Sequence, residues 1–394
     1  MHDHNNEKTT APLTPLSSLL VKVHSRCNLM CDYCYEYNCG NTSWRKKPKE
    51  MSEAVYEKML ERVREHSLQH GVREQFFSLH GGEPLLRRLD FFRYAVTRAQ
   101  KVLGPEIIVK FGTQTNATLL TEATVDLFAE LEIGIGVSID GPEQVHNKNR
   151  VYSNGRPSYQ DTLTGLQHLL TERGRTVFGG ILAVIDVSED PIPVFEHLAA
   201  FEPPSIDFLE PHGSWDSLPM GKSTADDTCY GDWLIRLFDH WFDGNSRAVP
   251  IRKFEELIEH LMGGTGSVES FGLEPVSLIT VATDGAIEMV DCIKASGPNA
   301  EYLGLNVFDH DFDMALAHPM MRQRQIGIEA LAPICHSCEL VWVCGGGYLP
   351  HRYGASNGYR NPTIYCADYR KLIQHIRSRL EAVLYAQPHA QATV

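Results

Sequence analysis

The 394-residue sequence lacks an apolar run of membrane-spanning length, and its first residues lack the pattern of a signal peptide. It also lacks an excess of positive charge: its formal net charge is −14, whereas a nucleic-acid-binding surface needs basic residues. It shows neither an internal repeat nor a low-complexity segment. These absences argue against a membrane protein, an exported protein and a nucleic-acid-binding protein. We therefore expect a cytoplasmic protein that has neither a membrane nor a nucleic acid as its partner.

Cysteine, in contrast, is plentiful. Ten cysteines in a chain without an export signal indicate reduced thiols or metal ligands, not disulfides. Three of them, Cys27, Cys31 and Cys34, have the spacing C-x3-C-x2-C. Three thiolates can hold three corners of a [4Fe-4S] cluster and leave the fourth iron open to a small molecule, whereas a four-cysteine cluster only relays electrons. A zinc knuckle is the alternative, but zinc sites usually have four ligands, and Cys39 is the only nearby fourth thiol.

Apolar, β-rich runs alternate with helical patterns along the first half of the chain. The runs that predict strands are 19–23, 75–79, 107–112, 133–139, 177–185 and 206–209. The patterns that predict helices are 89–102, 122–131, 158–170 and 193–201, together with a helix that starts after Ser52, a good N-cap residue. Six βα units in series predict an α/β fold with a parallel sheet and outer helices. Ligands of such sheets bind at the carboxyl ends of the strands, where the three-cysteine run lies.

The composition divides the chain into four parts. Residues 1–14 are polar and predict a disordered tail, and residues 15–214 carry the βα units. Residues 215–270 read as a connector of helices. Residues 271–394 form a second unit, rich in cysteine and glycine, that ends in a helix over 368–384.

The three-cysteine run resembles the cluster-binding motif of the radical S-adenosylmethionine (SAM) superfamily, C-x3-C-x-aromatic-C, with Tyr33 as the aromatic residue. The resemblance implies a partial (β/α)6 TIM-like barrel in which Cys27, Cys31 and Cys34 bind a [4Fe-4S] cluster. It also implies that SAM chelates the open iron, that one electron cleaves SAM to a 5′-deoxyadenosyl radical, and that Tyr33 lies near the adenine.

Two further segments resemble SAM-binding motifs of that superfamily. Gly81-Gly82-Glu83-Pro84 resembles its G-G-E-P motif, in which Glu83 accepts hydrogen bonds from the ammonium group of SAM. The segment 115–120 resembles T-N-G-T-L-L, which makes Asn116 a SAM contact. Ala117 replaces the glycine of that motif, so we expect its backbone to avoid the left-handed region.

A fourth segment resembles S-x-D-G-P-x3-H-x3-R, found in the branch that includes anaerobic sulfatase-maturing enzymes. It implies that Ser138 and Arg150 contact SAM, and an arginine suits a carboxylate because it donates two parallel hydrogen bonds. Residues 140–142 within it predict a plain turn. Leu209, at the end of the sixth predicted strand, is expected to line the adenine site.

The second unit resembles a SPASM extension, whose full form binds two auxiliary [4Fe-4S] clusters. Its outer-cluster pattern, C-x2-C-x5-C with one late cysteine, is complete, and it consists of Cys335, Cys338, Cys344 and Cys366. The spacing alone would also suit a four-thiolate zinc site. Tyr348 and Val290 stand where the inner cluster has cysteines, so we expect one auxiliary cluster, about eight irons per chain, and Cys292 as a buried thiol.

Asp291 falls where sulfatase-maturing enzymes carry their catalytic base, at the end of the segment Asp284-Gly285-Ala286-Ile287-Glu288-Met289-Val290-Asp291. A carboxylate that faces the space left by the missing cluster can accept a substrate proton. A hydrogen-bonded structural aspartate is the alternative reading. His351 and Glu288 are weaker candidates for the base.

The segments 344–353 and 361–368 resemble the maturases that crosslink ribosomal peptides into three-residue cyclophanes. The resemblance implies that an aromatic ring carbon is joined to the β-carbon of a residue two places later. It implies a ribosomal precursor peptide as substrate and a flavodoxin or ferredoxin as electron donor. Formylglycine formation on a sulfatase is one alternative, and a non-catalytic iron–sulfur or zinc scaffold is another.

Overall fold

The computed structural model describes residues 13–244, 248–266 and 268–386. Most of the predicted disordered tail, residues 1–12, lies outside the described residues. Its last residue, Thr14, is anchored, because its backbone N–H donates to Oε1 of Gln325 at 2.8 Å. In the described part of the chain, no helix is at once long enough and apolar enough to cross a bilayer.

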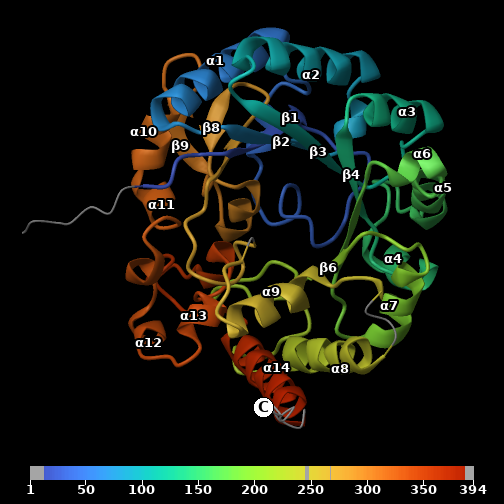
Figure 1. The fold of residues 1–394 in the computed structure, drawn as a ribbon, viewed down its shortest axis with the longest axis vertical. Helices are drawn as coiled ribbons and strands as arrows, with labels where there is room; N and C mark the ends of the chain where they lie inside the picture. The colour runs from blue at the N-terminus through green and yellow to red at the C-terminus, as the bar shows by residue number, and fades with distance from the viewer. Residues whose placement is uncertain (1–12, 245–247, 267, 387–394) are drawn as a thin grey trace, which may run out of the picture.

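One nine-stranded sheet forms the centre of the molecule, with the order β6-β5-β4-β3-β2-β1-β7-β8-β9 (Figure 1). Strands β6 to β1 and β7 pair in parallel, whereas β8 and β9 pair antiparallel. The strands are β1 (Ser18–His24), β2 (Glu74–Gly81), β3 (Ile108–Thr115), β4 (Ile133–Ser138), β5 (Phe178–Val184), β6 (Ile206–Leu209), β7 (Leu278–Val281), β8 (Ala286–Glu288) and β9 (Tyr302–Asn306).

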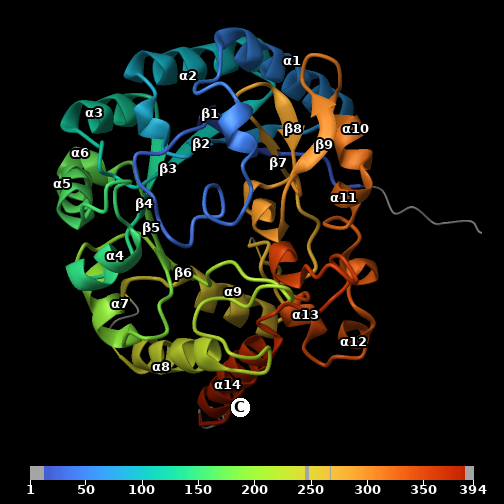
Figure 2. The same ribbon diagram turned by 180° about the vertical axis from the view of Figure 1, so that it is seen from behind.

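Helices cover the outer face of the first six strands (Figures 1 and 2). They are α1 (Glu53–His70), α2 (Leu89–Leu103), α3 (Glu122–Glu130), α4 (Glu143–Asn149), α5 (Tyr159–Leu169), α6 (Glu172–Arg175), α7 (Pro191–Ala199) and α8 (Cys229–Asp243). A helix follows each of the six parallel strands in sequence, so the predicted partial (β/α)6 barrel is confirmed.

The first helix shows why these elements were predictable. Ser52 accepts a hydrogen bond from the backbone N–H of Val55 at 3.2 Å, which confirms it as the N-cap of α1. Gly71 ends the helix in the left-handed region, with φ of 69°. Met59 and Leu60 are fully buried against the sheet, as the apolar spacing predicts.

The sheet continues into the cysteine-rich unit, which the sequence did not suggest. Strand β7 pairs in parallel with β1, and β8 and β9 extend the sheet from there. These strands are only four, three and five residues long, too short to give a clear periodic pattern. The domain boundaries at 214 and 270 stay predictions.

Further helices follow α8 in the sequence, and most of them lie on the open side of the barrel, whereas α10 packs against α1 (Figure 2). They are α9 (Arg252–Leu261), η4 (Asp291–Ser296), α10 (Phe312–Ala317), α11 (Pro319–Arg322), α12 (Pro333–His336), α13 (Val341–Cys344), η6 (Leu349–Arg352) and α14 (Cys366–Ala386). Helix α14 packs on α8, where the backbone N–H of Gly231 donates to Asp368 at 2.8 Å and Lys222 pairs with the same carboxylate at 2.6 Å.

Candidate active site at the carboxyl ends of the strands

The loop after β1 brings Cys27, Cys31 and Cys34 to the wall of one cavity of about 220 Å³. The loop begins at the end of β1, beside the end of β2, and backbone hydrogen bonds join the residues after β2 to the end of β1 and the start of the loop. Gly82 N–H donates to the carbonyl of His24 at 3.0 Å, and Glu83 N–H donates to that of Arg26 at 3.0 Å. The guanidinium of Arg26 anchors the loop further by lying over the ring of Trp44, 5.0 Å from its centroid.

One compact group of possible metal ligands lies away from the cysteines. Thiolates around zinc lie about 3.8 Å apart, given Zn–S bonds of about 2.3 Å and tetrahedral geometry. Among the described residues, the only three His, Cys, Asp or Glu ligand atoms within 4.8 Å of one another belong to His66, His70 and Asp313. Neither the three-cysteine set nor any three of the four C-terminal cysteines are this compact.

Burial suppresses ionisation of the loop thiols when they stand alone. It raises the pKa of Cys34 to about 12, and burial together with the charge of Glu83 raises the pKa of Cys27 still further. Thiolates at these positions therefore need a cation, and iron supplies one. Cluster binding would release these protons.

Gly82 has no room for a side chain. A Cβ there would lie 1.8 Å from Tyr37 Oη and 2.6 Å from the carbonyl carbon of Arg26. At Gly81 it would lie 2.1 Å from the carbonyl oxygen of His24. Both glycines line the cavity, and these contacts show that they also let β2 end directly against the cysteine loop.

Glu83 is 1% exposed and lies between the ends of β2 and β3. Its carboxylate accepts hydrogen bonds from Thr115 Oγ1 at 2.8 Å and from the backbone N–H of Asn116 at 2.9 Å. Burial raises its pKa in spite of these donors. The Asn116 amide in turn donates to Asn28 Oδ1 at 3.0 Å, so Glu83 fixes an asparagine against the cysteine loop.

The expectation for Ala117 is wrong. Its φ is +60°, in the left-handed region that the sequence reading excluded for an alanine. The turn after β3 is crossed closely by α5, where a Cβ at Gly165 would lie 1.9 Å from the carbonyl oxygen of Ala117. The turn therefore keeps its conformation without the glycine, because packing against α5 and hydrogen bonding to Glu83 hold it.

Tyr33, Asp140 and Arg150 form one buried network beside the cavity. The Tyr33 hydroxyl donates to Asp140 Oδ2 at 2.5 Å and accepts from Arg150 Nη1 at 2.7 Å. Arg150 Nε is buried without a hydrogen-bond partner, so the guanidinium keeps a donor for an anionic ligand. Ser138, at the end of β4, lines the same cavity and accepts from Gln114 Nε2 at 2.9 Å.

The interpretation of residues 140–142 as a plain turn is also wrong. Asp140 is 3% exposed, and besides Tyr33 it binds the backbone N–H of Val184 at 3.1 Å. It thereby joins the ends of β4 and β5 and orients both Tyr33 and Arg150. The sequence signal for this role is an aspartate directly after a buried strand. The Gly141-Pro142 pair that follows is also typical of a turn, and a turn was therefore predicted.

Leu209 lines the cavity as predicted, together with Leu182 and Val184 from β5, which the sequence reading missed. These three side chains make an apolar wall opposite the cysteine loop. Beyond Leu209 the lining continues with Glu210, Pro211 and His212.

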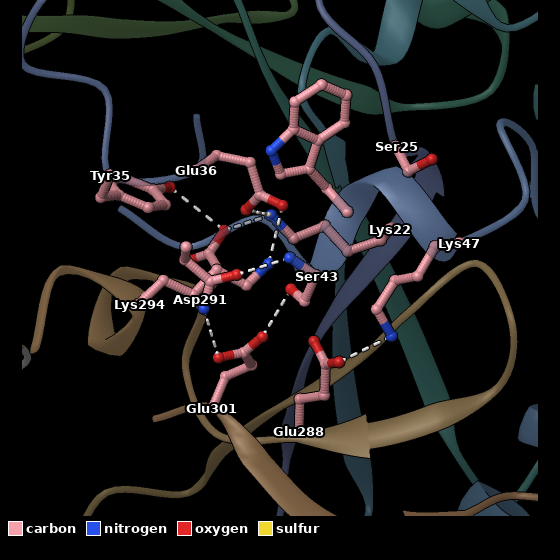
Figure 3. Close-up of polar contacts among 12 residues, drawn as sticks. Lys22, Ser25, Tyr35, Glu36, Ser43, Lys47, Glu288, Asp291, Lys294 and Glu301 are labelled. Carbon is pink, nitrogen blue, oxygen red and sulfur yellow. Dashed lines mark hydrogen bonds and ion pairs between the residues drawn. The ribbon is translucent and has the colours of Figure 1, made fainter. Parts of the chain in front are cut away.

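Asp291 lies behind the cavity wall in a buried charge cluster (Figure 3). Its Oδ2 pairs with Lys22 Nζ at 2.5 Å and accepts from the Tyr35 hydroxyl at 3.1 Å. Lys22 also pairs with Glu36 at 3.1 Å, and Glu36 pairs with Lys294 at 2.7 Å. Burial alone would raise the pKa of Asp291, but the charge of Lys22 holds it well below its usual range.

The other two candidates for the base are also buried. Glu288 pairs with Lys47 at 2.7 Å, and burial raises its pKa (Figure 3). His351 is 3% exposed, and its Nε2 lies 3.2 Å from Nδ1 of His212. His212 was not singled out from the sequence, although a histidine three residues beyond a strand end was a readable signal.

The four C-terminal cysteines come from two short helices, the turn after the first of them, and the start of α14. Cys335 lies in α12, Cys344 ends α13, Cys366 begins α14, and Cys338 follows α12. Burial, followed by the charge of Cys366, raises the pKa of Cys344 to about 12, so these two thiols influence each other. The same site is bordered by Arg352, whose guanidinium donates to the carbonyls of Gly345 and Gly347.

The positions where an inner cluster would have ligands hold other side chains. Cys292 is 5% exposed, as expected for a buried thiol, and it contacts the hydroxyl of Tyr348. Burial raises the pKa of both groups well above their usual values. Val290 is buried as part of the apolar core.

Comparison with known proteins agrees with this geometry. Residues 21–199 match the family model of the Radical SAM superfamily. These residues form a radical SAM domain. Membership implies SAM and a [4Fe-4S] cluster as cofactors, and the parallel sheet with its cysteine loop after β1 is the fold that the superfamily resemblance implied.

Curated relatives of this chain include two maturases. The serine-type anaerobic sulfatase-maturating enzyme of Bacteroides thetaiotaomicron is 26% identical over 394 residues, which cover 93% of this chain and 91% of that protein. The cysteine-type anaerobic sulfatase-maturating enzyme of Clostridium perfringens is 25% identical over 374 residues, which cover 93% and 98%.

Solved structures show the same fold. The structure of native anSMEcpe with bound AdoMet has a TM-score of 0.78 at 23% identity and covers 94% of this chain and 100% of that chain. Streptococcus suis SuiB bound to the precursor peptide SuiA has a TM-score of 0.55 at 15% identity, with 89% and 76% covered. The shared architecture includes the cysteine-rich C-terminal part.

Proposed function

We propose that this radical SAM protein modifies a ribosomally made precursor peptide and joins an aromatic side chain to a β-carbon. The observation that carries the proposal is the convergence of three thiols, Glu83, Ser138 and Arg150 on one cavity at the carboxyl ends of the strands. A non-catalytic scaffold does not require three cysteines and a buried, unpartnered guanidinium nitrogen to line the same cavity.

The residues of the cavity fit the implied cofactors. Cys27, Cys31 and Cys34 would hold the cluster, and the unpartnered Nε of Arg150 would donate to the carboxylate of SAM, with Ser138 beside it. Asn116 and Glu83 would bind the amino group, and Tyr33, Leu182 and Leu209 would line the adenine. When bound and reduced by one electron, this group supplies a 5′-deoxyadenosyl radical, by resemblance to the superfamily.

The protein's own part is to orient the peptide and exclude water. The peptide lies extended across the carboxyl ends of the strands, with the β-carbon facing the cavity. The four C-terminal cysteines would hold one auxiliary cluster, which suits an acceptor of the electron that the modified peptide loses. An external flavodoxin or ferredoxin serves as the reductant.

Formylglycine formation is a second candidate, because curated relatives that span 93% of the chain are sulfatase-maturating enzymes. Against it stand Val290 and Tyr348, where the resemblance to SPASM enzymes places ligands of an inner cluster. The segments 344–353 and 361–368 favour the cyclophane reaction instead.

The test is co-expression of the protein with the small open reading frame beside its gene, followed by mass spectrometry of the peptide. Crosslinking removes two hydrogen atoms and leaves a product that resists fragmentation between the joined residues. Oxidation of serine to formylglycine also removes two hydrogen atoms, but its aldehyde reacts with a hydrazine probe. A Cys27→Ala/Cys31→Ala/Cys34→Ala variant is the matched control.

A crosslinked peptide made by the wild type and not by the variant supports the proposal. A hydrazine-reactive product favours the second candidate. An unchanged peptide, together with no 5′-deoxyadenosine from the reconstituted protein, contradicts both and supports a scaffold.

A further inference from the structure

The proposed reaction needs a proton acceptor near the aromatic ring, and the expected one is poorly placed for that role. Asp291 is already bound to Lys22 and Tyr35, and its pKa lies well below its usual range. Asp291 is also not among the residues that line the cavity, so it does not face the space that a substrate ring would enter. Tyr35 and His80, which line the cavity, both contact Asp291 from the cavity side.

His212 lies in the cavity wall itself. It follows β6 and lines the cavity together with the three cysteines and Leu209. Its ring stands edge-on to that of Tyr35, with centroids 5.2 Å apart. Burial lowers the pKa of His212 to about 4, against the opposing charge of Asp291, so the imidazole is neutral at pH 7 and has a free lone pair.

His351 contacts His212 and occupies one of its two ring nitrogens. The distance between Nδ1 of His212 and Nε2 of His351 is 3.2 Å, and the second nitrogen of His351 is buried without a hydrogen-bond partner. When the Nδ1–H of His212 donates a hydrogen bond to Nε2 of His351, Nε2 of His212 is left as an acceptor. Burial and the charges of Lys253 and Arg352 hold the pKa of His351 well below its usual range, so His351 stays neutral and fixes the tautomer in which Nε2 of His212 can take up a proton.

We propose that His212 accepts the proton that the aromatic ring of the peptide loses, and that His351 positions His212 for this role. This inference rests on the proposed function and names its base. It replaces Asp291 in that role and leaves to Asp291 the task of holding Lys22 and Tyr35 in place.

The step balances in atoms and electrons. One hydrogen atom leaves the β-carbon and becomes part of 5′-deoxyadenosine, and a bond forms between that carbon and the ring. The ring then loses one proton, which His212 takes, and one electron, whose acceptor is an oxidised iron–sulfur cluster of the kind that the four C-terminal cysteines suit. The peptide is two hydrogen atoms lighter.

The route from the cavity leads toward those cysteines. The ring of His351 contacts Tyr365, with centroids 5.0 Å apart, and Tyr365 directly precedes Cys366. The histidine pair therefore connects the cavity lining to the residue that precedes one of the C-terminal cysteines.

The surroundings favour His212 over His80, the other neutral histidine of the cavity. The two differ in their neighbours: Nδ1 of His80 lies 3.6 Å from the Asp291 carboxylate, whereas Nδ1 of His212 lies 3.2 Å from a second imidazole. The groups that face His212 are Tyr35, Tyr348, His351 and the Asp291 carboxylate. Those that face His351 are His212, Tyr348, Tyr365, Lys253 and Arg352.

The first test is chemical footprinting of the reconstituted protein with diethyl pyrocarbonate, which modifies neutral imidazoles. We expect His212 to be modified at pH 7 and to be protected when SAM and peptide are present. His375, a partly exposed histidine of α14 that pairs with Asp239 at 2.8 Å, serves as the control and is modified in both states. A His212 that stays unmodified in the absence of ligands contradicts its place in the cavity wall.

The second test compares His212→Gln, His351→Gln, His80→Gln and Asp291→Asn, with His375→Gln as the control. We expect His212→Gln to slow crosslinking about 100-fold while 5′-deoxyadenosine still forms at nearly the wild-type rate, because a general base acts after hydrogen abstraction. His351→Gln shows a smaller loss in kcat with KM unchanged, since it acts through His212. Iron content and SAM affinity stay at wild-type values in both.

The outcomes separate the inference from the proposed function. A wild type that forms no crosslink with its peptide contradicts the proposed function, whereas the footprint of His212 still tests its place in the cavity wall. A wild type that forms the crosslink and a His212→Gln variant that does so equally well contradict the inference alone. The same holds if only Asp291→Asn or His80→Gln uncouples 5′-deoxyadenosine from product.

Discussion

Gly82 shows at the scale of one residue how closely the strand ends and the cysteine loop fit. A methyl group there would overlap Tyr37 and the backbone of Arg26. We expect Gly82→Ala to displace the loop and to lower the iron content of the reconstituted protein from about eight to about four atoms per chain. Iron and sulfide analysis measures this loss.

Gly134→Ala is the matched control for that substitution. Its nearest neighbour to a new Cβ is the carbonyl oxygen of Phe111 at 3.8 Å, which is ordinary contact. We expect the control to keep its iron. If Gly82→Ala also keeps the full iron content, the loop is more adaptable than its contacts with Gly82 indicate.

His146 gives a second prediction at the residue scale. It is fully buried beside Ser158, and burial, followed by the charge of Arg150, lowers its pKa to about 3 from 6.5. Between pH 8 and 6 the unfolded chain therefore binds more protons than the native one, and the native state loses roughly 0.8 kcal/mol as the pH falls. His146→Gln removes this contribution.

The measurement is the apparent Tm of the reconstituted protein, by anaerobic scanning fluorimetry at pH 6 and pH 8. The wild type should lose more stability toward pH 6 than His146→Gln does. Equal losses in the two proteins would mean that the native His146 takes up a proton in this range. Lys148→Gln, at an exposed position of the same helix, is the control for the substitution itself.

At the scale of elements, the charge cluster in Figure 3 joins β1 to η4. Lys22 is 5% exposed and Asp291 3%, so removing one partner leaves the other buried without its counter-ion. We expect Lys22→Met to destabilise the protein by about 3 kcal/mol. The double variant Lys22→Met/Asp291→Leu should recover part of that loss, because no buried charge of the pair is then left.

An exposed ion pair supplies the contrast. Arg93 and Glu130 join α2 to α3 at the surface, and Arg93→Met should change the apparent Tm little, because water and salt screen such pairs. Thermal unfolding of all four proteins tests the comparison. A Lys22→Met variant as stable as the wild type would show that water enters the cluster.

The sequence predicted elements well where one pattern decided them, and poorly where tertiary contacts did. Strand β6 was expected at 206–209 and occurs at Ile206–Leu209, because a short apolar run between turn signals has few other interpretations. Strands β7 to β9 were missed because pairing with β1, not periodicity, forms them. Ala117 adopts a left-handed conformation because α5 and Glu83 hold its turn, a constraint that no local pattern contains.

In the candidate site, too, the sequence did not reveal contacts between residues that are far apart in the chain. Motif spacing located the cysteines, Glu83, Ser138 and Arg150, since these residue types follow strand ends at fixed distances. It did not reveal that Lys22 neutralises Asp291, because the two residues are 269 positions apart. Nor did it bring His212 and His351 together, which are 139 positions apart.

At the scale of the whole molecule, two cysteine sites lie in one continuous sheet-based structure. The first lines the cavity, and the second lies where α12, α13 and α14 meet, next to the gap between β9 and β6 (Figure 1). Between them stand the rings of Tyr35, His212, His351 and Tyr365, each in contact with the next. The two sites are thus separate in ligands and connected through side chains.

Because the two cysteine sites share no ligand, we expect the loss of one cluster to leave the other bound. Cys338→Ala removes one of four ligands from the C-terminal site, so we expect the iron content to fall from about eight to about four atoms while the cysteine loop keeps its cluster. The variant should still form 5′-deoxyadenosine with dithionite as reductant, but it should not crosslink peptide, because the electron that the ring loses has no acceptor. Cys39→Ala, which lies outside both sets, is the control and should match the wild type.

The number of iron atoms per chain distinguishes one auxiliary cluster from two clusters and from a zinc site. About twelve irons in the wild type would show that an inner cluster is bound in spite of Val290 and Tyr348, and about four irons with one bound zinc would show a closed zinc site at the C-terminal cysteines. A Cys338→Ala variant that still crosslinks at the wild-type rate would mean that the electron leaves by another path. In that case the cluster at the C-terminal cysteines stabilises the fold that holds His351 against His212.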